Sequence, residues 1–495
     1  MKRLLLRSHS HSRSSCATWV KCLGASLLVA AGLAACGEGG GTGTAAQSTG
    51  ADRVFPNPTS PPPTLGDFDG DFAAFMAKAA ALKPEIMQRQ MALLQLRYDL
   101  ANRAEGGPAS CKTSRGKPVQ TGVRVKTPPG LGFRELAGMT PAAIKDADAF
   151  PAGFLPLPHP NHPVGGMVFP VSSIDGIKRQ TGRDLTRFDL DFDLPEHLLP
   201  EFPPAIFLTT RKDLGDVSRG QLVTTENFWA LFKDILNPKQ LDGLRLLLTP
   251  FPQQQFNLTS DRNSARPSLG VACFDCHING STNGATHQVG DIRPQAMRNR
   301  IDTTSLRGVA MQPIFGSQRG LASVEDFTEF EQRAAYFDGD PEAATRKGLN
   351  PLERGSQVHN MAEMQKILDF PPSKLDPLGK LDRSRATESE LRGEGLFFGK
   401  AQCATCHSGV AFTDGTLHDL QVERFFRHRL INGQQTKDDG PIKTFTLRGV
   451  KDTPPYFHDG RLLTLDDTVE FFNLVLGLRL GDDEKQDLVA YMCAL

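Results

Sequence analysis

Two short segments of the chain each place a pair of cysteines and a histidine in the order Cys-x-x-Cys-His. The motif is formed by Cys273, Cys276 and His277, and again by Cys403, Cys406 and His407. Thiols three positions apart lie about one helical turn apart, so both can add to the vinyl groups of one haem while the adjoining histidine ligates its iron. The spacing therefore predicts two covalently bound c-type haems, with His277 and His407 as iron ligands.

A competing interpretation of the motifs is a structural zinc site built from the two Cys-x-x-Cys pairs. It would leave both following histidines unexplained, and it would suit a cytosolic protein better. With nine cysteines and 12 histidines among 495 residues, two complete motifs are also very unlikely to arise by chance. We therefore favour haem, which bacteria attach outside the cytoplasm.

The N-terminus of the chain has the pattern of an export signal. Basic residues precede an apolar stretch at 22–35, which is too short to span a bilayer. The stretch runs into the sequence LAAC, which ends at Cys36 and resembles the bacterial lipobox. We expect a signal peptide at 1–35, lipidation of Cys36, and a flexible tether rich in Gly, Ser, Thr and Pro at 36–65. The protein would then be periplasmic and lipid-anchored to a bacterial membrane; the alternative is an ordinary signal peptide cleaved near Ala35.

The charge of the whole chain is balanced, with 56 basic and 56 acidic residues and a pI of about 7.2. A zero formal net charge argues against nucleic acid as a partner. Hydrophobic residues make up 39% of the chain, and no apolar run reaches the length of a membrane-spanning helix. These values exclude a polytopic membrane protein.

Helical patterns surround both motifs and would position them. Thr387 and Glu390 have the spacing of a capping box, at the start of a helix that leads to Cys403. Four leucines at helical spacing lie before the first motif: Leu241, Leu244, Leu247 and Leu248. Residues 483–495 form an amphipathic pattern that predicts a last helix. Cytochrome c domains pack such first and last helices against each other.

An internal repeat divides this part of the chain. The sequence LRGV at 306–309 recurs at 447–450. The two cysteine motifs are separated by a similar number of residues along the chain. We predict a mainly α fold with two cytochrome c-like helical domains, at 239–385 and 386–495. An additional N-terminal region of uncertain fold and unknown function, at 66–238, would precede them.

A resemblance to a known family is carried by the paired motifs together with the sequences TLRGV at 446–450 and PYFHDGR at 455–461. Over roughly residues 239–495 the chain resembles the bacterial dihaem cytochrome c peroxidase and MauG superfamily. The resemblance implies a peroxidase that reduces hydrogen peroxide to water at the haem on His277. Electrons would come through the second haem from a small periplasmic cytochrome c or a cupredoxin.

Three other functions remain open for a chain with this resemblance. One is a MauG-like oxidase that acts on a protein substrate through a high-valent dihaem state. Another is a dihaem electron carrier without enzymatic activity, and the last is an oxygenase that acts on a bulky substrate. A carrier would need strong ligands on both sides of both irons, so a visible spectrum with and without peroxide would separate these functions.

The chain departs from the family at two positions. Phe472 stands where the second haem of the family has a methionine ligand, and phenylalanine cannot ligate iron. The sixth ligand of that iron is then His418, His428, Met492, a water molecule or no ligand at all. Phe315 matches the position of an aromatic residue, usually Trp, that the family places between the two haems.

The resemblance also implies residues that act on peroxide beside the first haem. A family glutamate serves as the acid and base, and Glu329 and Glu331 lie in the matching region. His287 is another candidate, either as the distal base or as an iron ligand in a resting state. The competing interpretation is that these side chains lie on a solvated helix face or in a surface loop.

Two further features of the family concern ions and cysteines outside the motifs. The family's calcium ion would be bound by the backbone carbonyls of Thr453 and Pro455 and by Asp302, since oxygen ligands suit a hard cation. These residues could equally form ordinary turns. Cys111 and Cys493 remain after haem attachment and lipidation, and they could pair in an oxidising compartment.

Overall fold

The structure is a computed structural model that describes residues 111–122, 124–125, 130–146, 169–185, 194–250, 271–288, 300–317, 320–331, 353–420, 430–431, 434–435, 441–458 and 460–495, with scattered positions between 74 and 99. The predicted signal peptide, Cys36 and the tether lie outside the described residues. Within these ranges, every helix is too short or too polar to cross a membrane.

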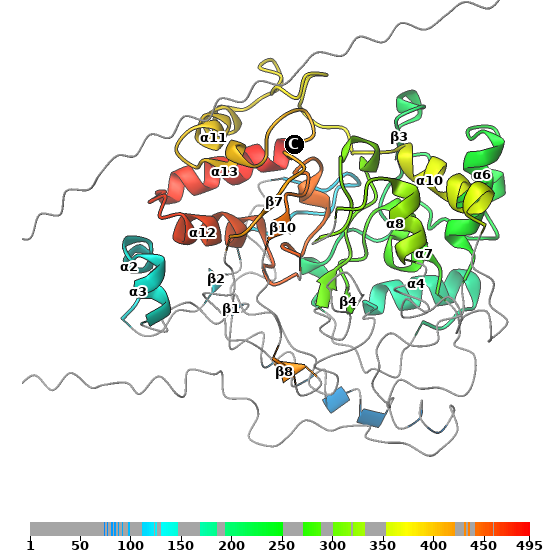
Figure 1. Cartoon of the computed structure of the whole chain (residues 1–495), viewed down its shortest axis with the longest axis horizontal. Helices are drawn as coiled ribbons and strands as arrows, with labels where there is room; N and C mark the ends of the chain where they lie inside the picture. Colours follow the sequence, from blue (N-terminus) through cyan, green and yellow to red (C-terminus); the bar gives the residue numbers. More distant parts are fainter. Residues whose placement is uncertain are drawn as a thin grey trace, which may run out of the picture. The chain divides into compact units, whose positions relative to one another are not determined.

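Helices form most of the regular structure, as the sequence predicts (Figure 1). The α-helices are α2 (Phe133–Gly138), α3 (Pro141–Asp146), α4 (Val171–Thr181), α5 (Phe228–Phe232), α6 (Pro238–Leu248), α7 (Cys273–Cys276), α8 (Val324–Glu331), α10 (His359–Lys366), α11 (Glu388–Phe398), α12 (Leu465–Val475) and α13 (Asp482–Ala494). The strands pair two by two, and every pair is antiparallel: β1 (Tyr98–Asp99) with β2 (Arg124–Val125), β3 (Phe207–Leu208) with β6 (Leu368–Asp369), β4 (Thr286–Gln288) with β5 (Arg300–Asp302), β7 (Leu417–His418) with β10 (Ile442–Lys443), and β8 (Leu430–Ile431) with β9 (Gln434–Gln435).

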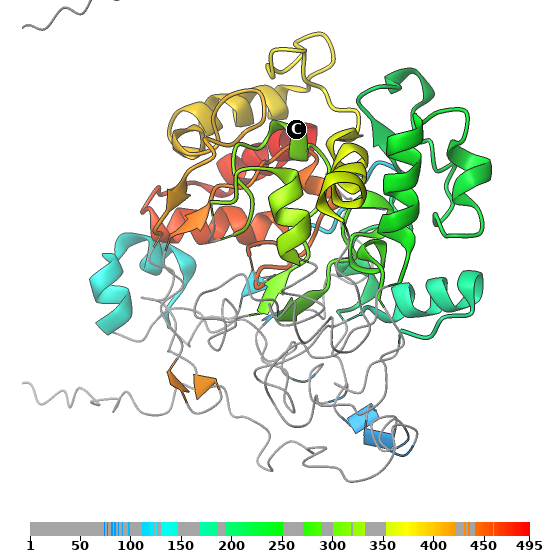
Figure 2. The same ribbon diagram turned by 45° about the vertical axis from the view of Figure 1, so that its right-hand side comes forward.

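Helices α11, α12 and α13 pack around the second motif (Figure 2). The predicted capping box is present: the Glu390 amide donates to Thr387 Oγ1 at 3.3 Å, and the Thr387 amide donates to Glu390 Oε2 at 2.8 Å. A Cβ on Gly393 would lie 2.0 Å from the carbonyl oxygen of Asp487, so only glycine allows α11 to approach α13 this closely. The rings of Phe397 and Tyr491 then meet across the two helices, 5.2 Å apart.

Helices α6, α8 and α10 pack around the first motif. The apolar side of α6 is buried as its leucine spacing predicts, with Leu244 and Leu247 at most 1% exposed. A Cβ on Gly243 would lie 1.9 Å from the carbonyl oxygen of Asn360, which again fixes a close helix approach. The same core includes Ile206, Phe232 and other residues upstream of position 239. The first core therefore draws on part of the region 66–238.

The two LRGV segments take the same local structure. Gly308 and Gly449 both have left-handed backbones, with φ of 70° and 67°, and each opens a short 3-10 helix. An isolated antiparallel bridge follows in both cases, and then a helix, α8 or α12. Helix α12 is capped by Thr464, whose hydroxyl accepts from the Asp467 amide at 3.2 Å.

Residues 111–122 bind across the second half of the chain. Cys111 and Cys493 form a disulfide, with their Cα atoms 6.1 Å apart. Farther along, the Gly122 amide donates to Asp466 Oδ2 at 2.9 Å. The carboxylate of Asp452 also accepts hydrogen bonds from the amide and the hydroxyl of Ser114, and it pairs with the buried guanidinium of Arg307 at 2.9 Å.

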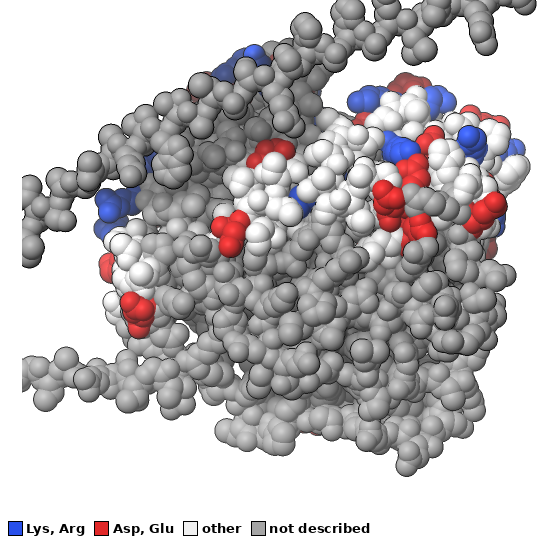
Figure 3. Space-filling model, in the orientation of Figure 1, with Lys and Arg blue, Asp and Glu red and all other residues white. Residues whose placement is uncertain are grey.

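Acidic and basic side chains are interspersed on the described surface of the face that Figure 3 shows. Many of them form short ion pairs, such as Lys366 with both Glu325 and Glu363. Mixed charge of this kind favours solubility over the binding of a polyanion.

Candidate haem sites

The first motif ends in a histidine whose ring is held by a hydrogen bond that leaves one ring nitrogen for iron. Helix α7 is a single turn that begins at Cys273 and ends at Cys276, and His277 follows directly. His277 Nδ1 lies 2.7 Å from the carbonyl oxygen of Thr304. Because a carbonyl only accepts, Nδ1 carries the proton and Nε2 keeps its lone pair for a metal. Burial lowers the pKa of His277 to about 4, so the ring is neutral at physiological pH.

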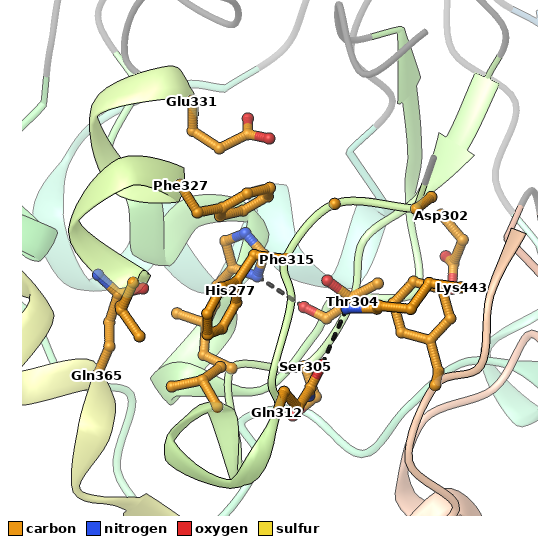
Figure 4. Close-up of a pocket in the computed structure, with 16 residues that line it drawn as sticks. His277, Asp302, Thr304, Ser305, Gln312, Phe315, Phe327, Glu331, Gln365 and Lys443 are labelled. Atoms are coloured by element: carbon orange, nitrogen blue, oxygen red, sulfur yellow. Dashed lines mark hydrogen bonds between the residues drawn. The ribbon is translucent and has the colours of Figure 1, made fainter. Parts of the chain in front are cut away.

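His277 lies in the wall of a cleft whose empty space is about 740 Å³, part of it open to solvent (Figure 4). Phe327 and Glu331 reach this cleft from α8, and Gln365 reaches it from α10. The Gln365 side chain is fixed by a 2.9 Å hydrogen bond to Thr328 Oγ1. The cleft has a mixed lining, with apolar side chains such as Phe315 and Phe327 beside charged ones such as Glu331 and Lys443. A cleft with a neutral imidazole in its wall could hold a haem with His277 as an iron ligand.

The structure separates the three residues predicted to act on peroxide. Glu331 lines the cleft with His277, whereas Glu329, two residues earlier on α8, does not. His287 lies on strand β4, opposite Ile301 of β5, and its side chain is not among the described ones. Of the described carboxylates predicted for this role, Glu331 is the one that shares a cavity with His277, the predicted iron ligand.

The second motif shows the same arrangement around its histidine. A short 3-10 helix at Cys403–Thr405 precedes Cys406 and His407. His407 Nδ1 lies 3.1 Å from the carbonyl oxygen of Phe412, and the carbonyl of Phe445 is a further acceptor. Burial lowers the pKa of His407, so this ring also presents a neutral Nε2.

Of the residues predicted as sixth ligands of the second iron, His418 is engaged by a carboxylate beside the second motif. Its Nε2 lies 2.6 Å from Asp414 Oδ2, next to Cys406. Burial alone would raise the pKa of Asp414, but hydrogen bonds from Thr416 and His418 hold it well below its ordinary value. Met492 is buried in the second core, at 6% exposure. His428 lies outside the described residues.

Phe472 packs among other aromatic rings. Its ring stacks on Phe457 of the PYFHDGR segment with 5.8 Å between centroids, and it meets Phe471 edge to face at 5.5 Å. Three apolar rings thus pack at the position where the resemblance predicts a methionine ligand, and none of them can ligate iron.

One residue predicted to bind calcium is tied to the segment that carries the other two. The Asp302 amide donates to the carbonyl oxygen of His458 at 2.7 Å, and Thr453 and Pro455 precede His458 in the same segment. The Thr453 hydroxyl donates to the carbonyl of Val450 at 3.2 Å. Carboxylate and carbonyl oxygens suit a hard cation, and the calcium site stays a prediction.

The structure does not support a zinc site shared by the two motifs. In the described part of the chain, metal-ligating side chains gather in two groups, one formed by Cys406, Asp414 and His418 and the other by Glu325, His359 and Glu363. Neither group combines cysteines from both motifs. Among the described residues, none of the four motif cysteines takes part in a disulfide bond, which leaves their thiols able to attach haem.

An ion pair inside the first motif was not predicted from the sequence. Both terminal nitrogens of Arg183 contact the carboxylate of Asp275, at 2.9 and 2.6 Å. Asp275 Oδ2 also accepts from the Ala272 amide at 2.7 Å, which fixes the start of α7. Helix α4, just before Arg183, buries Ile174 and Ile177 in one cluster with Cys276 and Ile278. The N-terminal region therefore supports the first attachment motif directly.

Comparison with known proteins supports the resemblance. No family model matches the chain. It is 29% identical over 285 residues to the cytochrome-c peroxidase IdrP1 of Pseudomonas sp. (strain SCT), which covers 46% of this chain and 75% of that protein. It is 29% identical over 191 residues to IdrP2 of the same organism, covering 31% of this chain and 52% of that protein. It is also 29% identical over 146 residues to the methylamine utilization protein MauG of Methylorubrum extorquens, covering 27% and 41%.

These relatives are haem oxidoreductases of the dihaem cytochrome c peroxidase and MauG superfamily, so the resemblance predicted from the motifs is confirmed. The matched part of the chain spans about half the length of IdrP2 and less of MauG.

Proposed function

We propose that the protein is a dihaem c-type peroxidase that reduces hydrogen peroxide to water, with electrons relayed from its second haem. The observation that carries this proposal is the cleft at His277. It brings a neutral iron ligand and the Glu331 carboxylate to one cavity that is open to solvent. The sequence relationship to cytochrome c peroxidases supports the same reaction.

The reaction consumes two electrons and two protons for each peroxide and yields two water molecules. When bound, the haem on His277 supplies the iron at which peroxide is reduced. Glu331 takes a proton from one peroxide oxygen and returns it to the other, as a positioned carboxylate does in general acid–base catalysis. Phe327 and Phe315 give part of the cavity an apolar wall beside this carboxylate.

The second haem, on His407, would serve as the electron relay within a repeated cytochrome c-like unit. The shared LRGV structure and the matching histidine–carbonyl contacts support two related domains. Phe445 is near both sites, because its backbone raises the pKa of His407 while the residue also lines the His277 cleft. Such proximity suits transfer of an electron between the irons.

The proposal includes a periplasmic, lipid-anchored protein that takes electrons from a small cytochrome c or a cupredoxin. A disulfide between Cys111 and Cys493 supports an oxidising compartment. A calcium ion bound by Asp302, Thr453 and Pro455 would join the segments that these residues come from. Changing Cys36→Ala should release the protein into the soluble fraction, and unchanged membrane fractionation would exclude this anchor.

A MauG-like oxidase is the second candidate, and Phe472 favours it. Without a thioether ligand, the second iron is easier to oxidise than the relay of an ordinary peroxidase. Oxidising equivalents from peroxide could then be shared between both irons and used on a protein substrate.

The test uses the haem-loaded protein and compares Glu331→Gln with Glu329→Gln. We expect Glu331→Gln to lower kcat/KM for peroxide by about 100-fold, the usual range for a lost acid–base group, and Glu329→Gln to retain activity. Two haems per chain, measured by pyridine haemochrome after acid-acetone extraction, confirm loading in both variants. Equal losses in both variants, or full activity in Glu331→Gln, would contradict the assignment.

A further inference from the structure

A buried lysine enters the first haem cleft from the second half of the chain. Lys443 lies on strand β10, which pairs with β7 just after the second motif, and its residue is only 5% exposed. It nevertheless lines the cleft of His277 (Figure 4). A buried ammonium group is costly unless the surrounding protein stabilises it, so its position is determined by specific contacts.

Two hydrogen bonds fix the ammonium group of Lys443. Its Nζ donates to Gln312 Oε1 at 2.9 Å and to the carbonyl oxygen of Ile314 at 3.1 Å. The Lys443 amide also donates to the carbonyl oxygen of Ser317 at 2.8 Å. All three acceptors belong to residues 312–317, which follow the first LRGV segment. The side chain therefore joins the two halves of the chain at the cleft.

The same ammonium group lies against aromatic rings from both halves. Lys443 Nζ is 4.5 Å from the ring centroid of Phe445 and 5.9 Å from that of Phe315. Both distances are within the range of a cation–π contact. Phe445 also contributes a carbonyl acceptor to His407, and Phe315 lies in the wall of the His277 cleft. The positive charge of Lys443 thus lies in the His277 cleft, which also contains the carboxylates of Asp302 and Glu331, and next to Phe445, which precedes the second LRGV segment.

A fixed positive charge at this position changes the energy of adding an electron to a nearby group or of removing one from it. In a poorly polarisable interior it stabilises an added electron nearby, and it opposes removal of an electron from the adjacent rings. The effect weakens with distance, so it acts most on the haem whose cleft Lys443 lines. It also makes Phe315 and Phe445 poor sites for a radical cation.

We propose that Lys443 is a positioning residue that raises the reduction potential of the haem at His277 and so directs electrons to it from the second haem. This inference rests on the proposed dihaem relay. With both haems bound, each transfer would move one electron from the iron held by His407 to the iron held by His277, and no bond would form or break. An external donor protein of the cytochrome or cupredoxin class then reduces the second iron again.

The test is a redox titration of both haems in the haem-loaded protein, followed by visible absorbance. Lys443→Met removes the charge and keeps much of the length of the side chain, whereas Lys443→Arg keeps the charge. Gln312→Glu is a second variant that nearly preserves shape and places a carboxylate beside the ammonium group. Lys380→Met removes an exposed lysine and serves as the matched control, because solvent and salt screen surface charges.

We expect Lys443→Met and Gln312→Glu to lower the potential of one haem by at least about 59 mV, a tenfold change in the one-electron equilibrium. Lys443→Arg should stay closer to the parent protein, and Lys380→Met should not differ from it. If Lys443→Met fails to fold, Gln312→Glu alone decides the question.

Two results would overturn the inference. One is that both variants carry two haems and keep both potentials. The other is that Lys443→Arg shifts the potentials as much as Lys443→Met, which would indicate packing rather than charge. Neither result tests the peroxidase proposal. That proposal fails if the parent protein binds two haems and does not react with peroxide.

Discussion

The guanidinium of Arg183 and the carboxylate of Asp275 form a two-point ion pair inside the first haem attachment motif, with N–O distances of 2.9 and 2.6 Å. The carboxylate is almost fully buried, since the Asp275 side chain is 4% exposed, while that of Arg183 is 25% exposed. A carboxylate buried in this way depends on its partner, because its desolvation is not recovered when the partner is removed.

Changing Arg183→Ala should therefore destabilise the protein by about 3 kcal/mol, the lower end of what a broken buried pair costs. The measurement is denaturant unfolding of the haem-loaded protein. Arg179→Ala is the control, since Arg179 is an exposed residue of α4, the helix that ends just before Arg183. Equal stability of the two variants would show that the ion pair does not support the motif. Adding Asp275→Asn to Arg183→Ala should restore part of the loss, because no buried charge then remains unpaired.

The disulfide between Cys111 and Cys493 predicts a second effect on stability. It closes a loop with a sequence separation of 382, so it restricts the unfolded chain strongly. Changing both cysteines to serine should lower the free energy of unfolding by about 3 kcal/mol. Thiol titration of the denatured, unreduced protein should find neither cysteine free. If both react, the cross-link is absent in solution and the serine variants should be as stable as the parent.

The pair of α11 and α13 predicts how stability depends on pH. Two hydrogen bonds from Arg392 and one from Ser389 hold the pKa of Asp487 below its ordinary value. A carboxyl group with a lowered pKa in the folded state stabilises the fold above its unfolded pKa, and this contribution is lost as the pH falls through the folded value. Asp487→Asn should therefore lower Tm at neutral pH, and the difference from the parent should shrink below about pH 4.

The matched control for this effect is Asp483→Asn, an exposed carboxylate in the first turn of the same helix. Thermal unfolding followed by circular dichroism from neutral to acidic pH gives the comparison. A difference for Asp487→Asn that stays constant over the whole pH range would point to lost packing instead of lost charge.

Local features of the fold could be predicted from the sequence, and long-range contacts could not. The capping box of Thr387 and the leucines of α6 depend on neighbours within one or two turns, so their spacing already determines them. The contacts of Lys443 with Gln312 and of Arg183 with Asp275 join residues 131 and 92 positions apart. Only the packing of the folded chain brings such residues together. Likewise, the sequence proposed Glu329 and Glu331 alike, and the rotation of α8 places Glu331 at the cleft.

The last prediction concerns the second haem and Phe472. A thioether ligand stabilises ferrous iron and raises the reduction potential, whereas water or a second histidine lowers it. With Phe472, Phe457 and Phe471 packed where the family has a methionine, the haem on His407 should have a lower potential than a histidine–methionine relay. The oxidised protein should then lack the weak near-infrared band of a ferric histidine–methionine haem.

Changing Phe472→Met supplies the missing ligand and should raise the potential of this haem by at least about 59 mV, with the near-infrared band appearing at the same time. Phe471→Met is the matched control, because Phe471 is a neighbouring ring of the same helix and is fully buried in the second core. The opposite finding is also informative. If the parent protein already shows the band and Met492→Leu abolishes it, Met492 is the ligand. The second haem would then be an ordinary high-potential relay, and the case that Phe472 makes for a MauG-like oxidase would be lost.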